Sequence, residues 1–348
     1  MRENKGIKRL FGTLPSGEEI FVYKICDGKF MAEIIEYGAS IISLRPFGRV
    51  DVVGGFDSLE DYLKDTSNQG AIVGRVANRI ADAKFEMNGS VYRLPNNDNG
   101  NCLHGGIGFQ HRRWRVSEHT KNSISLMYFS ESGEDGFPSD LSVKVTYSIQ
   151  NSAFIINYEA VPNGDTPICL TNHAFFNLDG FGMSVKDQSI QIWAKQYSEI
   201  NCNMIPTGHR PFVEGTKLDL RDPRKIGDAF SEEFGGYDHN MILSPVIFKS
   251  FGFHRVGLVA RASNQKITMQ MYTDQPCLQF YTGNFLGHGP AFKQGIPQIR
   301  HGAFCLEAQT EPNCIKHGEA IYHKGDIYRQ ITVYEFLKNS MIKKGSRI

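Results

Sequence analysis

Hydrophobic and polar residues alternate with a period of two along much of this 348-residue chain. In residues 141–150, LSVKVTYSIQ, every second residue from Leu141 to Ile149 is hydrophobic and the residues between them are polar. The alternation returns in residues 153–161, AFIINYEAV, after Asn151 and Ser152. Side chains of a strand change face at every residue, so this pattern predicts an antiparallel hairpin with one face in water.

Most of the chain carries similar strand signals. A second hairpin is expected in residues 84–94, where Asn88 and Gly89 suit a left-handed turn. Further strand segments are residues 18–38, 123–130, 188–197, 266–283 and 326–336. A short helix is expected only at residues 58–65, with Ser58 as its N-cap. Because no linker or repeat divides the sequence, we expect residues 1–348 to form a single all-β domain, a large antiparallel β-sandwich.

The composition narrows the possible partners. Hydrophobic residues make up 41% of the chain, enough for a core, and a net charge of +1 favours neither nucleic acid nor a membrane surface. The basic run in residues 338–348 is expected to be a solvated tail. Seven cysteines form no CxxC pair, and no apolar stretch approaches the roughly 18 residues that span a bilayer. With no signal-like apolar stretch at the start, we expect a cytoplasmic location.

Two polar clusters lie in the first third of the chain. In NQGAIVGRVANRIADAKF, Asn78 and Arg79 could direct an amide and a guanidinium at ligand oxygens, or lie on a surface turn. A phosphate-binding loop is unsupported, because no Gly-Lys-Ser/Thr follows. In the second cluster His104 precedes Gly105 and Gly106, so it is either a loop histidine or a group beside a closely approached ligand.

Later in the chain, His173 and Glu307 stand in apolar surroundings. A buried imidazole must be hydrogen-bonded or take part in chemistry, and His173 lies within CLTNHAFFNLDG. Glu307 follows the apolar residues 303–306, so it is either an exposed cap or a carboxylate with a perturbed pKa. Asp238 and Gln279 are weaker candidates, since a turn residue and a solvent-facing strand residue would look the same.

Several chemistries lack their sequence signatures. The histidines lack the close spacing of compact zinc motifs, so we expect no metal. A Ser-His-Asp hydrolase is unsupported, because no Gly-x-Ser-x-Gly elbow occurs. No dinucleotide-binding fingerprint follows a strand and opens a helix. What remains is a histidine and a glutamate for proton transfer, hydrogen-bonding groups, and the neighbouring aromatic residues Phe176, Tyr281 and Phe285. This inventory suits a neutral polyhydroxylated ligand and requires no cofactor.

Five ordered motifs, GRVANRI, LHGG, TNHAFFNL, QFYTGNF and CLEAQ, resemble the aldose 1-epimerase (galactose mutarotase) family from about residue 20 to about residue 335. The resemblance implies the galactose mutarotase-like β-sandwich and interconversion of the α and β anomers of free hexoses such as galactose and glucose. It implies Glu307 as general base and His173 as general acid, without metal or cofactor. Residues that would hold the sugar are Asn78, Arg79, His104, Asp238 and Gln279.

The resemblance also sets expectations for charge state and partners. To act as an acid, His173 should have its protonated form favoured, and a nearby carboxylate would do this. The expected partner is a monosaccharide, with no nucleic acid or membrane, and the expected state is a monomer or weak homodimer.

This chain departs from the common family pattern at three positions. Phe175 stands where a tyrosine is frequent, Ala308 replaces a threonine, and Asn313 replaces an aspartate. Two alternatives stay open. A hexose-6-phosphate 1-epimerase would need cations around the phosphate, for which Arg75, Arg112 and Arg113 are candidates. A non-catalytic sugar-binding module would not need both Glu307 and His173.

Overall fold

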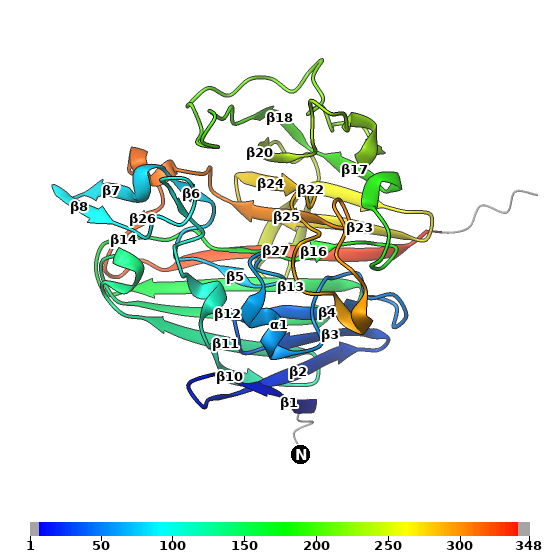
Figure 1. The fold of residues 1–348 in the computed structure, drawn as a ribbon, viewed down its shortest axis with the longest axis horizontal. Helices are drawn as coiled ribbons and strands as arrows, with labels where there is room; N and C mark the ends of the chain where they lie inside the picture. Colours follow the sequence, from blue (N-terminus) through cyan, green and yellow to red (C-terminus); the bar gives the residue numbers. More distant parts are fainter. Residues whose placement is uncertain (1–6, 340–348) are drawn as a thin grey trace, which may run out of the picture.

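The computed structural model describes residues 7–339, which form mostly antiparallel strands (Figure 1). The predicted hairpin is confirmed: β12 (Leu141–Gln150) and β13 (Ala153–Pro162) pair from Leu141 opposite Pro162 to Gln150 opposite Ala153. Along β12 the odd-numbered residues are buried and the others are not, as the alternation predicts. Most of the basic tail, residues 340–348, lies outside the described residues.

The largest layer is a ten-stranded sheet in which β27, near the end of the chain, lies between β13 and β23. The other strands follow on either side, with β21 attached to β22. Besides β12 and β13, the strands of this sheet are β10 (Arg115–His119), β11 (Ser123–Ser130), β17 (Ser189–Ile192), β19 (Arg224–Lys225), β21 (Phe248–Phe251), β22 (His254–Ser263), β23 (Ile267–Thr273) and β27 (Tyr328–Lys338).

Two smaller sheets pack against this layer. In Figure 1 the four-stranded sheet is blue, at the base of the view, and most of the five-stranded sheet is at the top. The four-stranded sheet contains β1 (Ile7–Thr13), β2 (Glu19–Asp27), β3 (Phe30–Ile35) and β4 (Ile41–Arg45). The five-stranded sheet runs in the order β16 (Phe175–Phe176), β25 (Phe304–Gln309), β24 (Cys277–Tyr281), β20 (Asp238–Leu243) and β18 (Ala194–Tyr197).

Short elements connect these layers. The α-helix found within residues 7–339, α1 (Leu59–Lys64), begins as predicted at Ser58, whose side chain accepts a hydrogen bond from the backbone N–H of Asp61. No helix in this range is long and apolar enough to cross a membrane. The two-stranded pairs are β5 (Ile72–Val73) with β15 (Thr171–Asn172), β6 (Arg79–Ile80) with β9 (Cys102–Leu103), β7 (Lys84–Met87) with β8 (Ser90–Arg93), and β14 (Thr166–Pro167) with β26 (Ile321–Tyr322).

Two of the predicted strand segments each contain two strands that belong to different sheets. Residues 188–197 divide into β17 and β18, and residues 266–283 divide into β23 and β24. In both cases the first strand lies in the ten-stranded sheet and the second in the five-stranded sheet. The chain therefore passes between the layers twice within these segments, which joins the two sheets covalently.

The main core lies between the sheets, and its largest cluster includes Ile34 of β3, Val145 of β12 and Leu306 of β25. On β25 the residues Phe304, Leu306 and Ala308 all belong to this cluster. Because the direction of side chains alternates, Cys305 and Glu307 point to the opposite face of the same strand. That opposite face of the five-stranded sheet carries the site described next.

Candidate active site

A cavity of about 260 Å³ opens on the face of the five-stranded sheet that points away from the main core. It is lined by all seven residues predicted from the sequence, although they come from widely separated parts of the chain. These residues are Asn78, Arg79, His104, His173, Asp238, Gln279 and Glu307. The structure therefore brings the complete predicted set together at one cavity.

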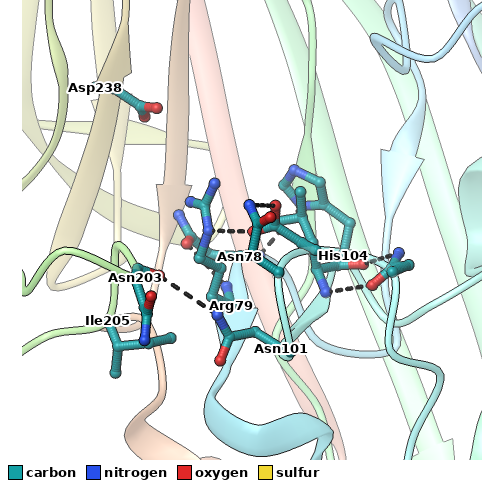
Figure 2. Close-up of polar contacts among 12 residues, drawn as sticks. Asn78, Arg79, Asn101, His104, Asn203, Ile205 and Asp238 are labelled. Atoms are coloured by element: carbon teal, nitrogen blue, oxygen red, sulfur yellow. Dashed lines mark hydrogen bonds and ion pairs between the residues drawn. The ribbon is translucent and has the colours of Figure 1, made fainter.

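Asn78, Arg79 and His104 form one side of the cavity, on the short β6–β9 pair and its flanking residues (Figure 2). The backbone N–H of Asn78 donates a hydrogen bond to His104 Nδ1 at 3.2 Å, and the His104 N–H donates to the Asn78 carbonyl at 3.1 Å. Since Nδ1 of His104 accepts, its neutral ring carries the proton on Nε2. Arg79 is oriented by Asp98, whose Oδ2 lies 2.6 Å from the Arg79 Nε.

The other side of the cavity is built by three adjacent strands of the five-stranded sheet. Gln279 of β24 pairs with Glu307 of β25, and its Nε2 donates a 2.6 Å hydrogen bond to Asp238 Oδ1 on β20. The structure decides between the alternatives that the sequence left open for two residues. Glu307 is a buried carboxylate within its strand and not an exposed cap, and the buried Gln279 faces the cavity and not solvent.

His173 and Glu307 face each other across this cavity. The His173 Nε2 lies 3.7 Å from Glu307 Oε2, longer than a hydrogen bond. Among the residues that the structure describes, none hydrogen-bonds Glu307 Oε2, although this atom is buried. Buried polar atoms normally have a partner, so the pair leaves an acceptor and a ring nitrogen open to a bound ligand.

Burial changes the pKa of both groups. Desolvation and then the charge of Asp238 raise the pKa of Glu307 well above its usual value, and Arg79 opposes this only in part. Desolvation lowers the pKa of His173 to about 4, opposed by a hydrogen bond to its own backbone. Burial thus disfavours the protonated form of His173, contrary to the expectation that a nearby carboxylate would favour it. Desolvation is the largest cause for both groups, so burial favours a neutral Glu307 and a neutral His173.

The two asparagines that flank His173 have structural roles. Asn172 Nδ2 donates to the carbonyl of Gly70 at 2.7 Å, and Asn177 Nδ2 donates to the carbonyl of Gly302 at 2.8 Å. His173 itself donates its backbone N–H to the Ala71 carbonyl. These bonds tie the polar stretch to neighbouring loops and fix the backbone beside β16.

The aromatic residues divide between the cavity and the core. Tyr281 and Phe285 line the cavity, whereas Phe176 packs in the main core against Phe304 and Tyr334. Phe175 lines the cavity instead, stacked on the His173 ring with centroids 5.0 Å apart. Sequence reasoning missed several lining residues, namely Asp65, Thr66, Ser67, Asn68, Leu103, Leu286, His288, Gly289 and Gln298.

The arginines proposed as phosphate ligands lie elsewhere. Arg75 is buried and donates to the carbonyl of Pro138 at 2.7 Å, to Thr166 Oγ1 and to Ser130 Oγ. Arg112 pairs with Glu134 and Asp135, and Arg113 with Glu18. Within residues 7–339, Arg79 is the one Arg or Lys that lines the cavity.

His104, His173 and Glu307 also form a group that could hold a metal ion, since each offers one ligand atom and these atoms lie within 4.8 Å of one another. An ion there would be held by side chains that proton transfer would also use. The expectation of a metal-free site stays a prediction.

Comparison with known proteins identifies the family of this chain. The sequence model of the family described as aldose 1-epimerase matches residues 22–335. This chain belongs to the aldose 1-epimerase family. The galactose mutarotase of Mus musculus is 37% identical over 340 residues, covering 94% of this chain and 98% of the mouse protein. The aldose 1-epimerase of Escherichia coli (strain K12) is 31% identical, covering 87% of this chain and 91% of its own.

Solved structures of similar proteins show the same fold. An aldose epimerase homologue from C. elegans superposes with a TM-score of 0.83 at 25% identity, covering 92% of this chain and 99% of its own. A galactose 1-epimerase from Lactobacillus acidophilus NCFM gives 0.82 at 24% identity, covering 97% of this chain and 99% of its own. The predicted all-β, galactose mutarotase-like sandwich is thus confirmed.

Two of the three departures from the family pattern lie outside the cavity. Ala308 packs in the main core, because it follows Glu307 and faces the other side of β25. The side chain of Asn313 accepts a hydrogen bond from the backbone N–H of Ala81 at 3.0 Å. Phe175 is the departure that reaches the cavity.

Proposed function

We propose that Glu307 and His173 exchange protons with an aldose bound in the cavity, Glu307 as base and His173 as acid. The enzyme is an isomerase that interconverts α and β anomers of aldoses, as its family membership establishes. The observation that carries the assignment is the buried, unpartnered Glu307 Oε2 lying 3.7 Å from His173 Nε2.

The proton count of the pair fits ring opening. In the productive form Glu307 is ionised and the Nε2 of His173 is protonated. Glu307 takes the proton of the anomeric hydroxyl while His173 gives its Nε2 proton to the ring oxygen, and the C1–ring oxygen bond breaks. The bond between C1 and C2 then rotates, and the reverse transfers close the ring on the other face of the aldehyde.

Burial favours the state that follows ring opening. That state holds a neutral Glu307 and a neutral His173, which are the charge states that the raised pKa of Glu307 and the lowered pKa of His173 favour. Before and after the step the pair holds one proton, so no net charge enters or leaves the low-dielectric cavity. Each positioned proton transfer contributes about 10²–10⁴-fold to the rate.

The remaining polar groups are proposed to hold the sugar. The carboxylate of Asp238 and the amides of Gln279 and Asn78 can bind hydroxyl groups, and the Nε2–H of His104 can donate to a sugar oxygen. Arg79 adds a cationic donor. Tyr281 and Phe285 supply aromatic surface for the apolar face of the ring.

The name of the mouse relative leads us to propose galactose as a substrate. A free hexose suits the cavity better than a hexose 6-phosphate, because Arg79 is the one lining Arg or Lys among residues 7–339 and already pairs with Asp98. We further propose that the protein acts on its own or as a weak homodimer, in the cytoplasm, without nucleic acid or membrane partners.

Polarimetry on freshly dissolved α-galactose tests the assignment. Glu307→Gln and His173→Gln should each lower kcat by about 100-fold or more. Isothermal titration should still detect sugar binding to both variants. Matched controls are Glu118→Gln, exposed on β10, and His209→Gln, whose side chain is 82% exposed. If either cavity variant keeps a rate within threefold of wild type, that role assignment is wrong.

A further inference from the structure

The two ring nitrogens of His173 lie in different surroundings. Nε2 faces Glu307 Oε2 at the cavity, whereas Nδ1 lies 3.7 Å from the Sγ of Cys305. An imidazole that gives and takes a proton at Nε2 must keep its other proton on Nδ1 throughout. Such rings normally have a partner for Nδ1 that fixes the tautomer and the ring orientation.

Cys305 is placed for this role by the strand that carries Glu307. It lies two positions before Glu307 on β25, so both side chains project from the same face of the sheet. Its neighbour across the sheet is Phe175, whose ring stacks on His173. Cys305 is fully buried, and burial raises the pKa of its thiol well above the usual value, so the sulfur stays uncharged.

We propose that Cys305 is a positioning residue: its Sγ accepts the Nδ1–H of His173, so that Nε2 is the nitrogen that exchanges a proton with the sugar. This inference rests on the role proposed for His173. Cys305 touches neither the sugar nor the reacting atoms. It acts by holding one tautomer of the ring.

An uncharged partner suits this site better than a carboxylate. A carboxylate beside Nδ1 would stabilise the imidazolium and keep His173 protonated, whereas a thiol sulfur is a weak, neutral acceptor. The ring can then return to its neutral form when it has given up the Nε2 proton. Because the sulfur is a weak acceptor, two further contacts help to hold the His173 ring. Phe175 stacks on it, and His104 meets it edge-on with the centroids of the two histidine rings 5.3 Å apart.

The first test reads the tautomer directly. In full-length enzyme labelled with ¹⁵N-histidine, at pH 7 and without sugar, the ring signals of His173 are assigned from their loss in His173→Gln. We expect Nδ1 to be protonated and Nε2 to be unprotonated in wild type. In Cys305→Ala the two tautomers should mix. A wild-type ring protonated mainly at Nε2 would overturn the proposal, whatever the catalytic rate.

The second test is kinetic. Cys305→Ala should lower kcat about 3- to 10-fold, with KM within twofold, because the stacked Phe175 ring and the edge of the His104 ring still hold the imidazole. Cys305→Ser should restore most of kcat, since a hydroxyl oxygen can accept the same proton. Cys277→Ala, the same truncation at a buried position of β24, is the control and should keep the wild-type kcat.

These outcomes separate the inference from the proposed function. If His173→Gln stays active, the assignment of His173 fails, and the NMR experiment still reports which nitrogen holds the proton. If Cys305→Ala folds, keeps the wild-type tautomer and keeps full kcat, Cys305 has no positioning role. If Cys305→Ala does not fold, the proposal is tested by the tautomer of His173 in the wild type and by the kcat of Cys305→Ser.

Discussion

Gln279 and Glu307 lie directly opposite each other on the antiparallel strands β24 and β25, and both side chains reach the same cavity. Gln279 in turn donates to Asp238 on β20. Three adjacent strands thus bring the Gln279 amide together with the carboxylates of Glu307 and Asp238, and the charge of Asp238 raises the pKa of Glu307. The groups proposed to bind sugar and the proposed base are therefore electrostatically coupled.

The kcat/KM of the enzyme should fall at both low and high pH. Below about pH 4, the pKa of His173, the pair gains a second proton, which leaves Glu307 protonated and unable to act as base. Above the raised pKa of Glu307 the pair loses its proton and the acid is gone. Asp238, Arg79 and His104 also face the pair and shift these limbs. We expect kcat/KM, corrected for the spontaneous reaction, to show a plateau between the limbs. A single rise centred near an ordinary histidine pKa of about 6.5 would contradict this.

Removing the buried carboxylate should stabilise the fold. Because the pKa of Glu307 is raised in the folded state, its favourable contribution is complete below about pH 4.3 and is lost as the pH rises through the folded-state value. Glu307→Gln removes this penalty. At pH 8 we expect its Tm to exceed wild type by about 2 °C or more, and the difference to shrink at pH 4. Calorimetry should show no such trend for Glu118→Gln. An unchanged or lower Tm at pH 8 would argue against a destabilising carboxylate.

The Arg79–Asp98 ion pair should govern sugar binding. Both side chains are less than one-fifth exposed, at 16% and 19%, and the contact of 2.6 Å holds the guanidinium in one orientation. Charge-assisted hydrogen bonds contribute about 1.5–3 kcal/mol, so losing one at the lower limit corresponds to about tenfold. We expect Asp98→Asn to raise KM for galactose about tenfold with kcat within twofold.

Asp82→Asn is the control for that experiment, because the Asp82 side chain is 68% exposed and its 3.4 Å contact with Lys316 lies outside the cavity. Its KM should match wild type. A loss confined to kcat in Asp98→Asn would instead place Arg79 among the groups that act on the transition state.

Arg75 should be needed for stability and not for catalysis. Arg75 is 1% exposed, and its guanidinium donates to the carbonyls of Pro138 and Ser139 and to the buried hydroxyls of Thr166 and Ser130. Arg75→Met leaves these acceptors unsatisfied and should lower the free energy of unfolding by about 3 kcal/mol. Below the melting transition, kcat/KM should stay within twofold of wild type. Urea unfolding with Arg115→Met, exposed on β10, as the matched control measures the difference. A stable Arg75→Met enzyme with impaired kcat/KM would refute the structural role.

Much of the fold could be predicted because strand alternation is local. The hairpin of β12 and β13, the Asn88–Gly89 turn between β7 and β8, and the Ser58 cap all follow from neighbouring residues. The strand changes between sheets at residues 188–197 and 266–283 could not be predicted, because pairing partners are distant in sequence. That residues 1–348 form one domain stays a prediction.

The seven candidate site residues could be predicted from sequence motifs, whereas side-chain orientation and charge state depend on tertiary packing. The direction in which a side chain points decides whether Phe175 or Phe176 meets the sugar, and the alternation alone leaves both assignments possible. The charge state of His173 depends on how completely the fold excludes water, which no local pattern encodes. Cys305 could have been noticed, because it lies two positions before Glu307 in a strand and must share its face.

The alternation along β25 has a consequence for how this strand can vary. Phe304, Leu306 and Ala308 pack in the main core, whereas on the opposite face Glu307 lines the cavity and Cys305 lies beside His173, so alternate positions have different roles. Inserting or deleting a single residue here would exchange the two sets, sending a carboxylate into the core and an aromatic ring into the cavity. Substitutions along this segment keep each position on its own face of the sheet, whereas an insertion or deletion does not.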